Sequence, residues 1–108
     1  MASPPEVAVV EAALAALPKI VGQVSQYSDA SPEALRFFGK AFVAAHQTCP
    51  GGVSIEFGTR CGGSALLFAR LLEALYPSKA YGETPMLFTV DPYGNKPYQG
   101  GDYVAGGL

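Results

Sequence analysis

The sequence predicts an α/β protein in which N-terminal helices are followed by one strand, helix, strand unit. Three observations support this fold class. Two helical patterns with start signals occupy the first half of the chain. A short strand pattern then runs into a glycine loop and a leucine-rich helical pattern, and an apolar strand pattern follows that helix. The chain has 108 residues, the size of one small domain or of part of a larger one.

The first half of the chain, residues 1–49, is expected to be a helical region. Ser3 to Glu6 has the Ser-x-x-Glu form of a capping box with proline in the first turn. The alanine-rich run behind it predicts a first helix that ends at about Pro18. The weak periodicity of residues 19–30 predicts a loop, with a short helical extension over residues 20–24 as the alternative.

A second helix is predicted behind Ser31, because serine is a good N-cap and proline and glutamate follow it. It is expected to end near Thr48. Apolar residues at steps of three and four mark its expected buried face: Leu35, Phe38, Phe42 and Ala45. His46 is interpreted as a cation at the helix C-terminus rather than as a catalytic base.

The second half, residues 50–108, is expected to be a partial cofactor-binding region. Residues 53–57 predict a short strand, and residues 63–75 predict a helix. Residues 86–90 form an almost uninterrupted apolar run, typical of a strand covered on both faces in a parallel sheet. The tail from residue 92 onward is predicted to be a loop. The expected buried stripe of the helix consists of Leu67, Leu71, Leu72 and Leu75.

Composition argues against several classes of partner. The net charge is −2 and the basic residues are scattered, so we expect no nucleic-acid binding. No apolar run approaches the roughly 18 residues of a membrane span, and no basic segment precedes an apolar one, so a cytoplasmic location is expected. Cys49 and Cys61 lack the spacing of metal ligands and are interpreted as reduced thiols.

The segment from Glu56 to Ser64, Glu-Phe-Gly-Thr-Arg-Cys-Gly-Gly-Ser, carries the most chemical information. Its glycines allow a ligand to approach the backbone, and the helix start offers unpaired amides to an anion. The loop lacks the lysine of a P-loop and the Gly-x-Gly-x-x-Gly spacing of a dinucleotide loop. A carboxylate at Glu56 would repel a phosphate but bind an ammonium, and Asp91 after the next strand can accept hydrogen bonds from a ribose. An amine, a carboxylate and a ribose occur together in S-adenosylmethionine.

This loop, the leucine-rich helix and the Val-Asp-Pro-Tyr-Gly segment at residues 90–94 resemble class I S-adenosylmethionine-dependent methyltransferases. The resemblance covers residues 50–102 and is strongest to the macrocin-type and novobiocin-type sugar O-methyltransferases. It implies a Rossmann-like fold, of which only the first two strands are visible, and O-methyl transfer to a small-molecule acceptor. The sequence is therefore interpreted as a truncated or incomplete catalytic domain.

The resemblance also implies roles for matching residues. Glu56 would bind the methionine amine, and the glycines of the loop would pass close to the methionine moiety. Ser64 would help to bind its carboxylate, and Asp91 would bind the ribose hydroxyls. Separately from the resemblance, Tyr93 lies next to Asp91 in a segment of tyrosines and glycines, which suggests that it covers the cofactor or lines an acceptor pocket. The expected cofactor-binding residues are Glu56, Gly58, Thr59, Gly62, Gly63, Ser64, Asp91 and Tyr93. No catalytic base and no metal site are assigned.

Two other interpretations stay open. The chain could be a non-enzymatic, degenerate methyltransferase-like module that pairs with another chain or forms a homo-oligomer, because a two-stranded parallel unit leaves apolar surface uncovered. A nucleotide-dependent oxidoreductase fragment is also conceivable, but the glycine spacing disfavours it.

Overall fold

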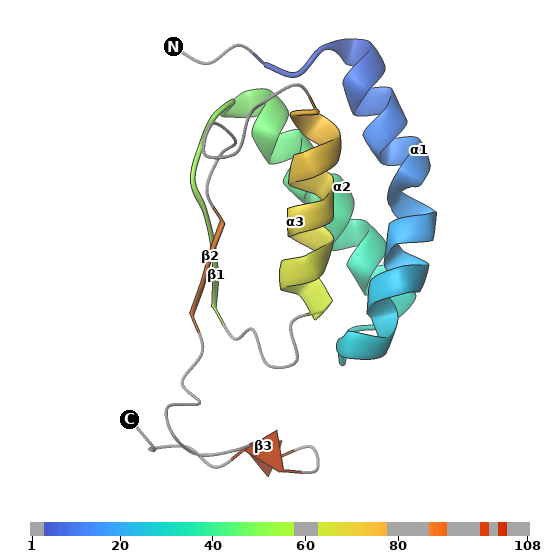
Figure 1. Cartoon of the computed structure of the whole chain (residues 1–108), viewed down its shortest axis with the longest axis vertical. Helices are drawn as coiled ribbons and strands as arrows, with labels where there is room; N and C mark the ends of the chain where they lie inside the picture. The colour runs from blue at the N-terminus through green and yellow to red at the C-terminus, as the bar shows by residue number, and fades with distance from the viewer. Residues whose placement is uncertain (1–3, 58–62, 78–86, 91–97, 100–101, 104–108) are drawn as a thin grey trace.

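The computed structural model describes residues 4–57, 63–77, 87–90, 98–99 and 102–103. This part of the chain is mostly helical, with a small two-stranded parallel sheet. Helices α1 (Val7–Val24), α2 (Pro32–Thr48) and α3 (Gly63–Leu75) pack against one another, and strands β1 (Ser54–Phe57) and β2 (Leu87–Val90) lie along one side of them (Figure 1). The predicted order of two helices followed by a strand, helix, strand unit is confirmed.

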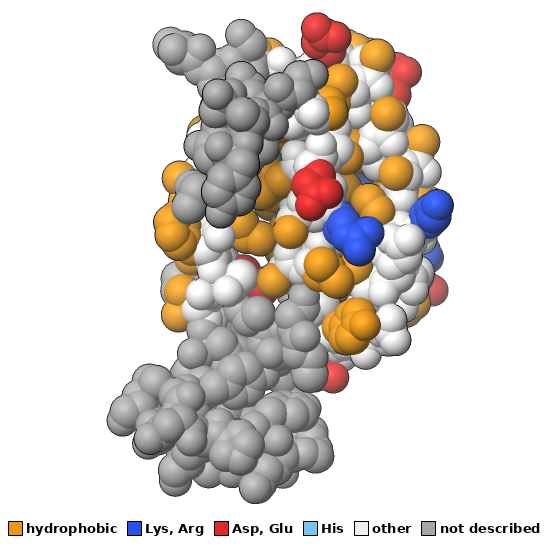
Figure 2. Space-filling view, viewed as in Figure 1, with side chains coloured by type: hydrophobic (Ala, Val, Ile, Leu, Met, Phe, Trp, Pro, Cys, Tyr) orange, Lys and Arg blue, Asp and Glu red, His pale blue; other side chains and the backbone are white. Residues whose placement is uncertain are grey.

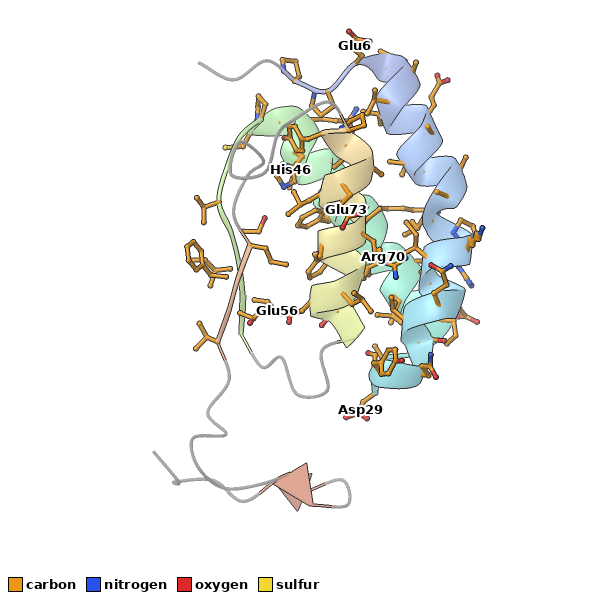
Figure 3. All side chains as sticks on the ribbon, in the orientation of Figure 1. Glu6, Asp29, His46, Glu56, Arg70 and Glu73 are labelled. Carbon is orange, nitrogen blue, oxygen red and sulfur yellow. The ribbon has the colours of Figure 1, made fainter. Side chains whose placement is uncertain are left out.

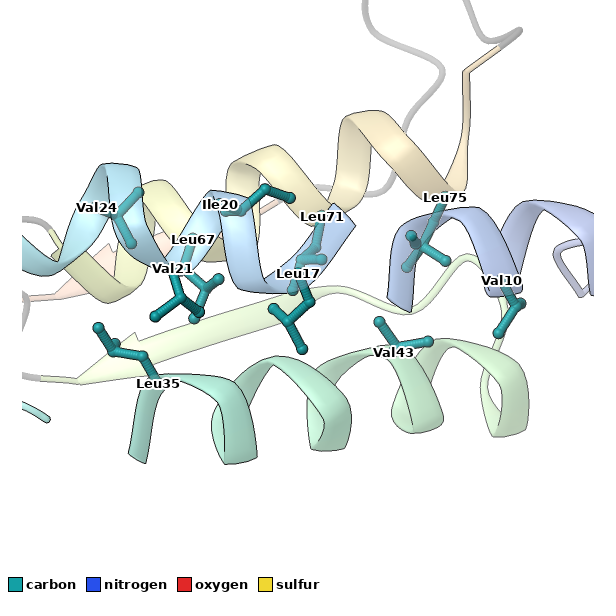
Figure 4. Packing of buried hydrophobic residues seen from close by; sticks show 11 residues of the cluster. Val10, Leu17, Ile20, Val21, Val24, Leu35, Val43, Leu67, Leu71 and Leu75 are labelled. Atoms are coloured by element: carbon teal, nitrogen blue, oxygen red, sulfur yellow. The ribbon is translucent and has the colours of Figure 1, made fainter. Parts of the chain in front are cut away.

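The hydrophobic core lies between the three helices (Figure 4). Each helix contributes the stripe of apolar residues that faces the other two, and removal of these side chains from water is the main force that holds the helices together. All four leucines predicted to form the buried stripe of α3 are buried. The core consists of Val10, Ala13, Leu17, Ile20, Val21, Val24, Leu35, Val43, Leu67, Leu71 and Leu75.

The starts of the first two helices differ in their capping. Ser31 caps α2 as predicted, because its Oγ accepts a hydrogen bond from the Ala34 N–H at 3.1 Å. Helix α1 begins at Val7 behind Glu6, which makes no side-chain cap hydrogen bond. Ser3, the predicted cap of α1, lies outside the described residues.

Helix α1 is longer than the sequence predicts, because Pro18 lies inside it and does not end it. A proline removes one helical hydrogen bond, but the turns after it carry three buried apolar side chains, at Ile20, Val21 and Val24. Burial of these side chains against the other helices offsets the lost hydrogen bond. The short 3₁₀ helix η1 (Ser25–Tyr27) follows directly.

Among the described residues, the helix Val7–Tyr27 is long and apolar enough to cross a membrane, with a mean hydropathy of 1.6. The expectation that no run reaches this length is therefore wrong. Length and composition alone do not separate a membrane span from a signal sequence or from the core helix of a soluble protein. In this fold the helix supplies one side of the core, and the cytoplasmic location stays a prediction.

The buried face of α2 is rotated from the predicted one. Phe38 is 41% exposed and Ala45 is also exposed, so both predictions are wrong. The buried residues are Leu35, Gly39, Val43 and His46. A glycine and a histidine stand on this face, so a search for apolar residues at helical spacing selects the neighbouring stripe instead.

Strands β1 and β2 pair in parallel, with Ser54 opposite Leu87 and Phe57 opposite Val90. The helices lie on one side of this sheet (Figure 1). The other face is open: Val53, Ile55, Phe88 and Val90 are between 48% and 61% exposed. The prediction that residues 86–90 are covered on both faces is therefore wrong for the described strand β2.

The tail contains secondary structure that the sequence does not predict. Strands β3 (Tyr98–Gln99) and β4 (Asp102–Tyr103) pair in antiparallel orientation. Each strand has two residues, which is too short to produce a readable alternation of apolar and polar positions.

Candidate functional site

The candidate site lies where the two parallel strands end. Phe57, the last residue of β1, is the register partner of Val90, the last residue of β2. Both strands therefore end at the same edge of the sheet, and ligands of open α/β sheets bind outside such carboxyl ends. Glu56 stands one residue before the end of β1, opposite Thr89. Asp91 follows Val90 directly in the sequence and lies outside the described residues.

Glu56 has the most unusual environment at this edge. Its side chain lies between β1 and α3, toward the N-terminal half of that helix (Figure 3). The carboxylate oxygen Oε1 is buried and has no hydrogen-bond partner among the described residues. A buried acceptor without a donor typically costs about 1–3 kcal/mol, and more when it is charged. The group that would best satisfy this oxygen is a donor that carries positive charge.

Helix α3 begins at this edge with two residues that the sequence assigns to the site. Ser64 is half-buried in the first turn. The first turn contains no acidic side chain, so no residue of that turn offsets the partial positive charge of the helix start. An anionic group is therefore favoured at this end of α3.

Gly63 has a packing role that the sequence does not reveal. A Cβ atom at this position would lie 2.5 Å from the Cβ of Ser28 and 2.7 Å from the carbonyl oxygen of Tyr27. Glycine therefore allows α3 to start directly against the turn that follows η1. The predicted approach of Gly63 to a ligand is a separate property and stays a prediction.

Of the predicted site, the structure describes Glu56, one residue before the end of β1, and Gly63 and Ser64, in the first turn of α3. The other predicted cofactor-binding residues lie outside the described residues: Gly58, Thr59, Gly62, Asp91 and Tyr93. Their assignments stay predictions.

A buried polar cluster around His46 is missing from the sequence-based site. His46 is 3% exposed, and its Nδ1 lies 2.9 Å from the Tyr76 hydroxyl. That hydroxyl accepts a hydrogen bond from the Gly51 N–H at 3.3 Å, so its own proton is available to Nδ1. The imidazole proton is then on Nε2, which faces the Ser54 hydroxyl at 3.5 Å.

This environment corrects the interpretation of His46 as a helix-terminal cation. Burial lowers the pKa of His46 from its ordinary value, because desolvation disfavours the charged imidazolium. His46 therefore links α2, the residue after α3 and the start of β1 as a neutral side chain. No pattern in the sequence connects His46 with Tyr76, because the two residues are 30 positions apart.

Within the described part of the chain, no group of three or more His, Cys, Asp and Glu residues is placed to hold a metal ion. Cys49 is an exposed free thiol. Cys61, in the glycine loop, lies outside the described residues.

Comparisons with protein-family models, with curated proteins and with solved structures gave no match to this chain.

Proposed function

We propose that the chain binds S-adenosylmethionine at the carboxyl edge of the sheet and belongs to the Rossmann-like class I methyltransferases. The proposed reaction is O-methyl transfer to a small-molecule acceptor. The observation that carries the proposal is the buried Oε1 atom of Glu56, which lacks a hydrogen-bond partner among the described residues. An ammonium group would supply both a donor and a compensating charge.

The amino-acid part of S-adenosylmethionine has the two charges that this edge favours. Its ammonium would bind Glu56, and its carboxylate would bind the start of α3 with help from Ser64. A phosphate-bearing ligand fits less well, because the Glu56 carboxylate would repel it. Asp91 follows the neighbouring strand end in the sequence, and its carboxylate would accept hydrogen bonds from the ribose hydroxyls.

The contribution of the protein to the reaction would be positioning. When bound, S-adenosylmethionine supplies a methyl group on a positively charged sulfur. Glu56 and the start of α3 would hold the amino-acid part, and Asp91 would hold the ribose. With both ends fixed, an acceptor oxygen can be aligned with the methyl group, and alignment alone can lower a barrier by several kcal/mol.

Calorimetry with three ligands tests the proposal. S-adenosylmethionine and S-adenosylhomocysteine carry the amino-acid part, whereas methylthioadenosine has the ribose but lacks the ammonium and the carboxylate. Glu56→Gln should weaken the first two by about ten-fold or more, which corresponds to loss of one charged hydrogen bond, and should leave methylthioadenosine unchanged. Asp91→Ala should weaken all three ligands.

The matched control is Glu73→Gln, which removes the charge of an exposed glutamate on α3 (Figure 3). It should leave the affinity for all three ligands unchanged. Absence of binding heat with the wild-type chain would contradict the proposal. So would a loss of methylthioadenosine binding in Glu56→Gln as large as the loss of S-adenosylmethionine binding.

A second candidate function is a non-enzymatic module that pairs with another chain. It is favoured by the open outer face of the sheet, where Val53, Ile55, Phe88 and Val90 are exposed. Figure 2 shows hydrophobic side chains along the side of the molecule that carries the strands. Absence of ligand binding, together with self-association that Phe88→Glu abolishes, would favour this function over the methyltransferase.

A further inference from the structure

Helix α2 carries an apolar surface on the side that faces away from the core. Phe37 is 69% exposed and Phe38 is 41% exposed, and their rings contact each other edge to face with centroids 6.2 Å apart. Ala41, Ala44 and Ala45 are also exposed on this helix. Neighbouring exposed apolar residues of this kind mark contact surfaces more often than isolated ones do.

The exposed surface of α2 has a regular pattern of charge. Glu33, Phe37, Lys40 and Ala44 follow one another at steps of four, three and four, so they form one stripe along the helix. All four residues are exposed, and the stripe lies opposite the buried face of α2. Viewed along the helix axis, Glu33 and Lys40 lie on the same side of Phe37. The two charged residues are about 10.5 Å apart along the axis.

This pattern is complementary to itself in an antiparallel pair. A two-fold axis midway between residues 33 and 40 passes beside Phe37. It brings each Glu33 opposite Lys40 of a second copy, and it brings the two Phe37 rings together. A parallel pair would instead place Glu33 against Glu33 and Lys40 against Lys40, which is repulsive.

We propose that α2 pairs with α2 of a second copy of this chain in this antiparallel arrangement. The contact is isologous, since the same stripe serves both copies, and two such stripes close a dimer without leaving a free site. The aromatic rings form the centre of the contact, and the charged residues fix its orientation. The proposal does not depend on S-adenosylmethionine binding.

Sedimentation velocity of the full chain over a range of concentrations tests the dimer. The wild type should show a monomer–dimer equilibrium. Phe37→Glu should raise the dissociation constant by at least about thirty-fold, as expected for loss of an aromatic residue at the centre of an interface. Phe88→Glu, which changes an exposed aromatic residue on the sheet, is the matched control and should leave the equilibrium unchanged.

Charge reversal tests the antiparallel orientation. Glu33→Lys and Lys40→Glu should each weaken the dimer roughly ten-fold, because each change turns two attractive pairs into two repulsive ones. The double variant exchanges the partners of both pairs and should regain affinity to within about three-fold of the wild type. Circular dichroism checks that each variant is folded. If Phe37→Glu is unfolded, the charge-reversal variants alone determine whether α2 forms the proposed dimer.

Three results would overturn the proposal. The first is a wild type that stays monomeric at every concentration. The second is a dimer that Phe88→Glu dissociates and Phe37→Glu does not. The third is a double charge-reversal variant that binds no better than the single variants.

Discussion

Gly39→Ala tests the contact between α1 and α2 that determines which face of α2 is buried. Gly39 lies on the buried face of α2, against Leu17 of α1. A Cβ atom at position 39 would lie 2.5 Å from Leu17 Cδ1 and 3.2 Å from Cδ2, well inside the 3.5–4.0 Å at which carbon atoms attract each other. Leu17 is 1% exposed, so its side chain has little room to move away.

Two opposing effects determine the result. Alanine is a better helix former than glycine by about 1 kcal/mol. The extra carbon overpacks the core, which typically costs about 1–3 kcal/mol. The net effect of Gly39→Ala should therefore be a loss of stability of about 1 kcal/mol.

In a Leu17→Ala background, the effect of Gly39→Ala should change from destabilising to stabilising. The change removes the atoms that the new Cβ would contact, at a cost of its own of about 2–5 kcal/mol for a buried leucine. In that background only the helix-forming term remains, so Gly39→Ala should raise stability by about 1 kcal/mol. The two positions should thus be coupled by about 2 kcal/mol.

Gly22→Ala is the matched control, because Gly22 lies inside α1 and a Cβ there meets nothing within 4 Å. It should raise stability by about 1 kcal/mol. Urea unfolding followed by circular dichroism measures all variants, with an unchanged dependence on denaturant as the check for two-state behaviour. Two results would contradict this packing of Gly39 against Leu17: equal stabilisation by Gly39→Ala and Gly22→Ala, or the same effect of Gly39→Ala with and without the Leu17 side chain.

Two further predictions concern the surroundings of the site. Because burial lowers the pKa of His46, its contribution to stability should be complete above the unfolded value of 6.5. That contribution should be lost as pH falls from 6.5 to the lowered pKa of the folded state, with a slope of up to about 1.4 kcal/mol per pH unit. In His46→Gln, the free energy of unfolding measured with urea should no longer depend on pH in this way within that window. Gly63→Ala should destabilise by about 2 kcal/mol or more even without ligand, because the Tyr27 carbonyl is backbone and cannot turn away as a side chain can; unchanged urea stability would contradict the packing of α3 on this turn.

The sequence predicts those parts of the fold that depend on local signals. The start of α2 at Ser31, the leucine stripe of α3 and both parallel strands follow from capping, spacing and composition, and the structure confirms them. It does not predict that α1 continues past Pro18, because the energy that favours this continuation comes from contacts with the other helices. Local patterns do not contain such contacts.

In the candidate site too, local sequence signals predict some features, whereas others depend on contacts between distant elements. The loop motif identifies Glu56 as a candidate ligand for an ammonium, and this assignment needs only the sequence. That its Oε1 atom is buried without a partner among the described residues follows from the position of β1 beside α3. The sequence does not predict the role of His46, because its partners, Tyr76 and Ser54, lie outside α2.

The N-terminal helices hold the site in place, although the loop motif lies outside them. At the start of α3, Gly63 packs against the turn at Tyr27, which follows α1. At its end, Tyr76 is hydrogen-bonded to His46 of α2, and the same histidine faces Ser54 at the start of β1. Helix α3 is thus fixed at both ends, and β1 at its beginning, by residues of the helical half. The placement of Glu56 relative to the start of α3 therefore depends on contacts with residues 1–49, and substitutions in these helices should alter binding of the proposed ligand without touching it.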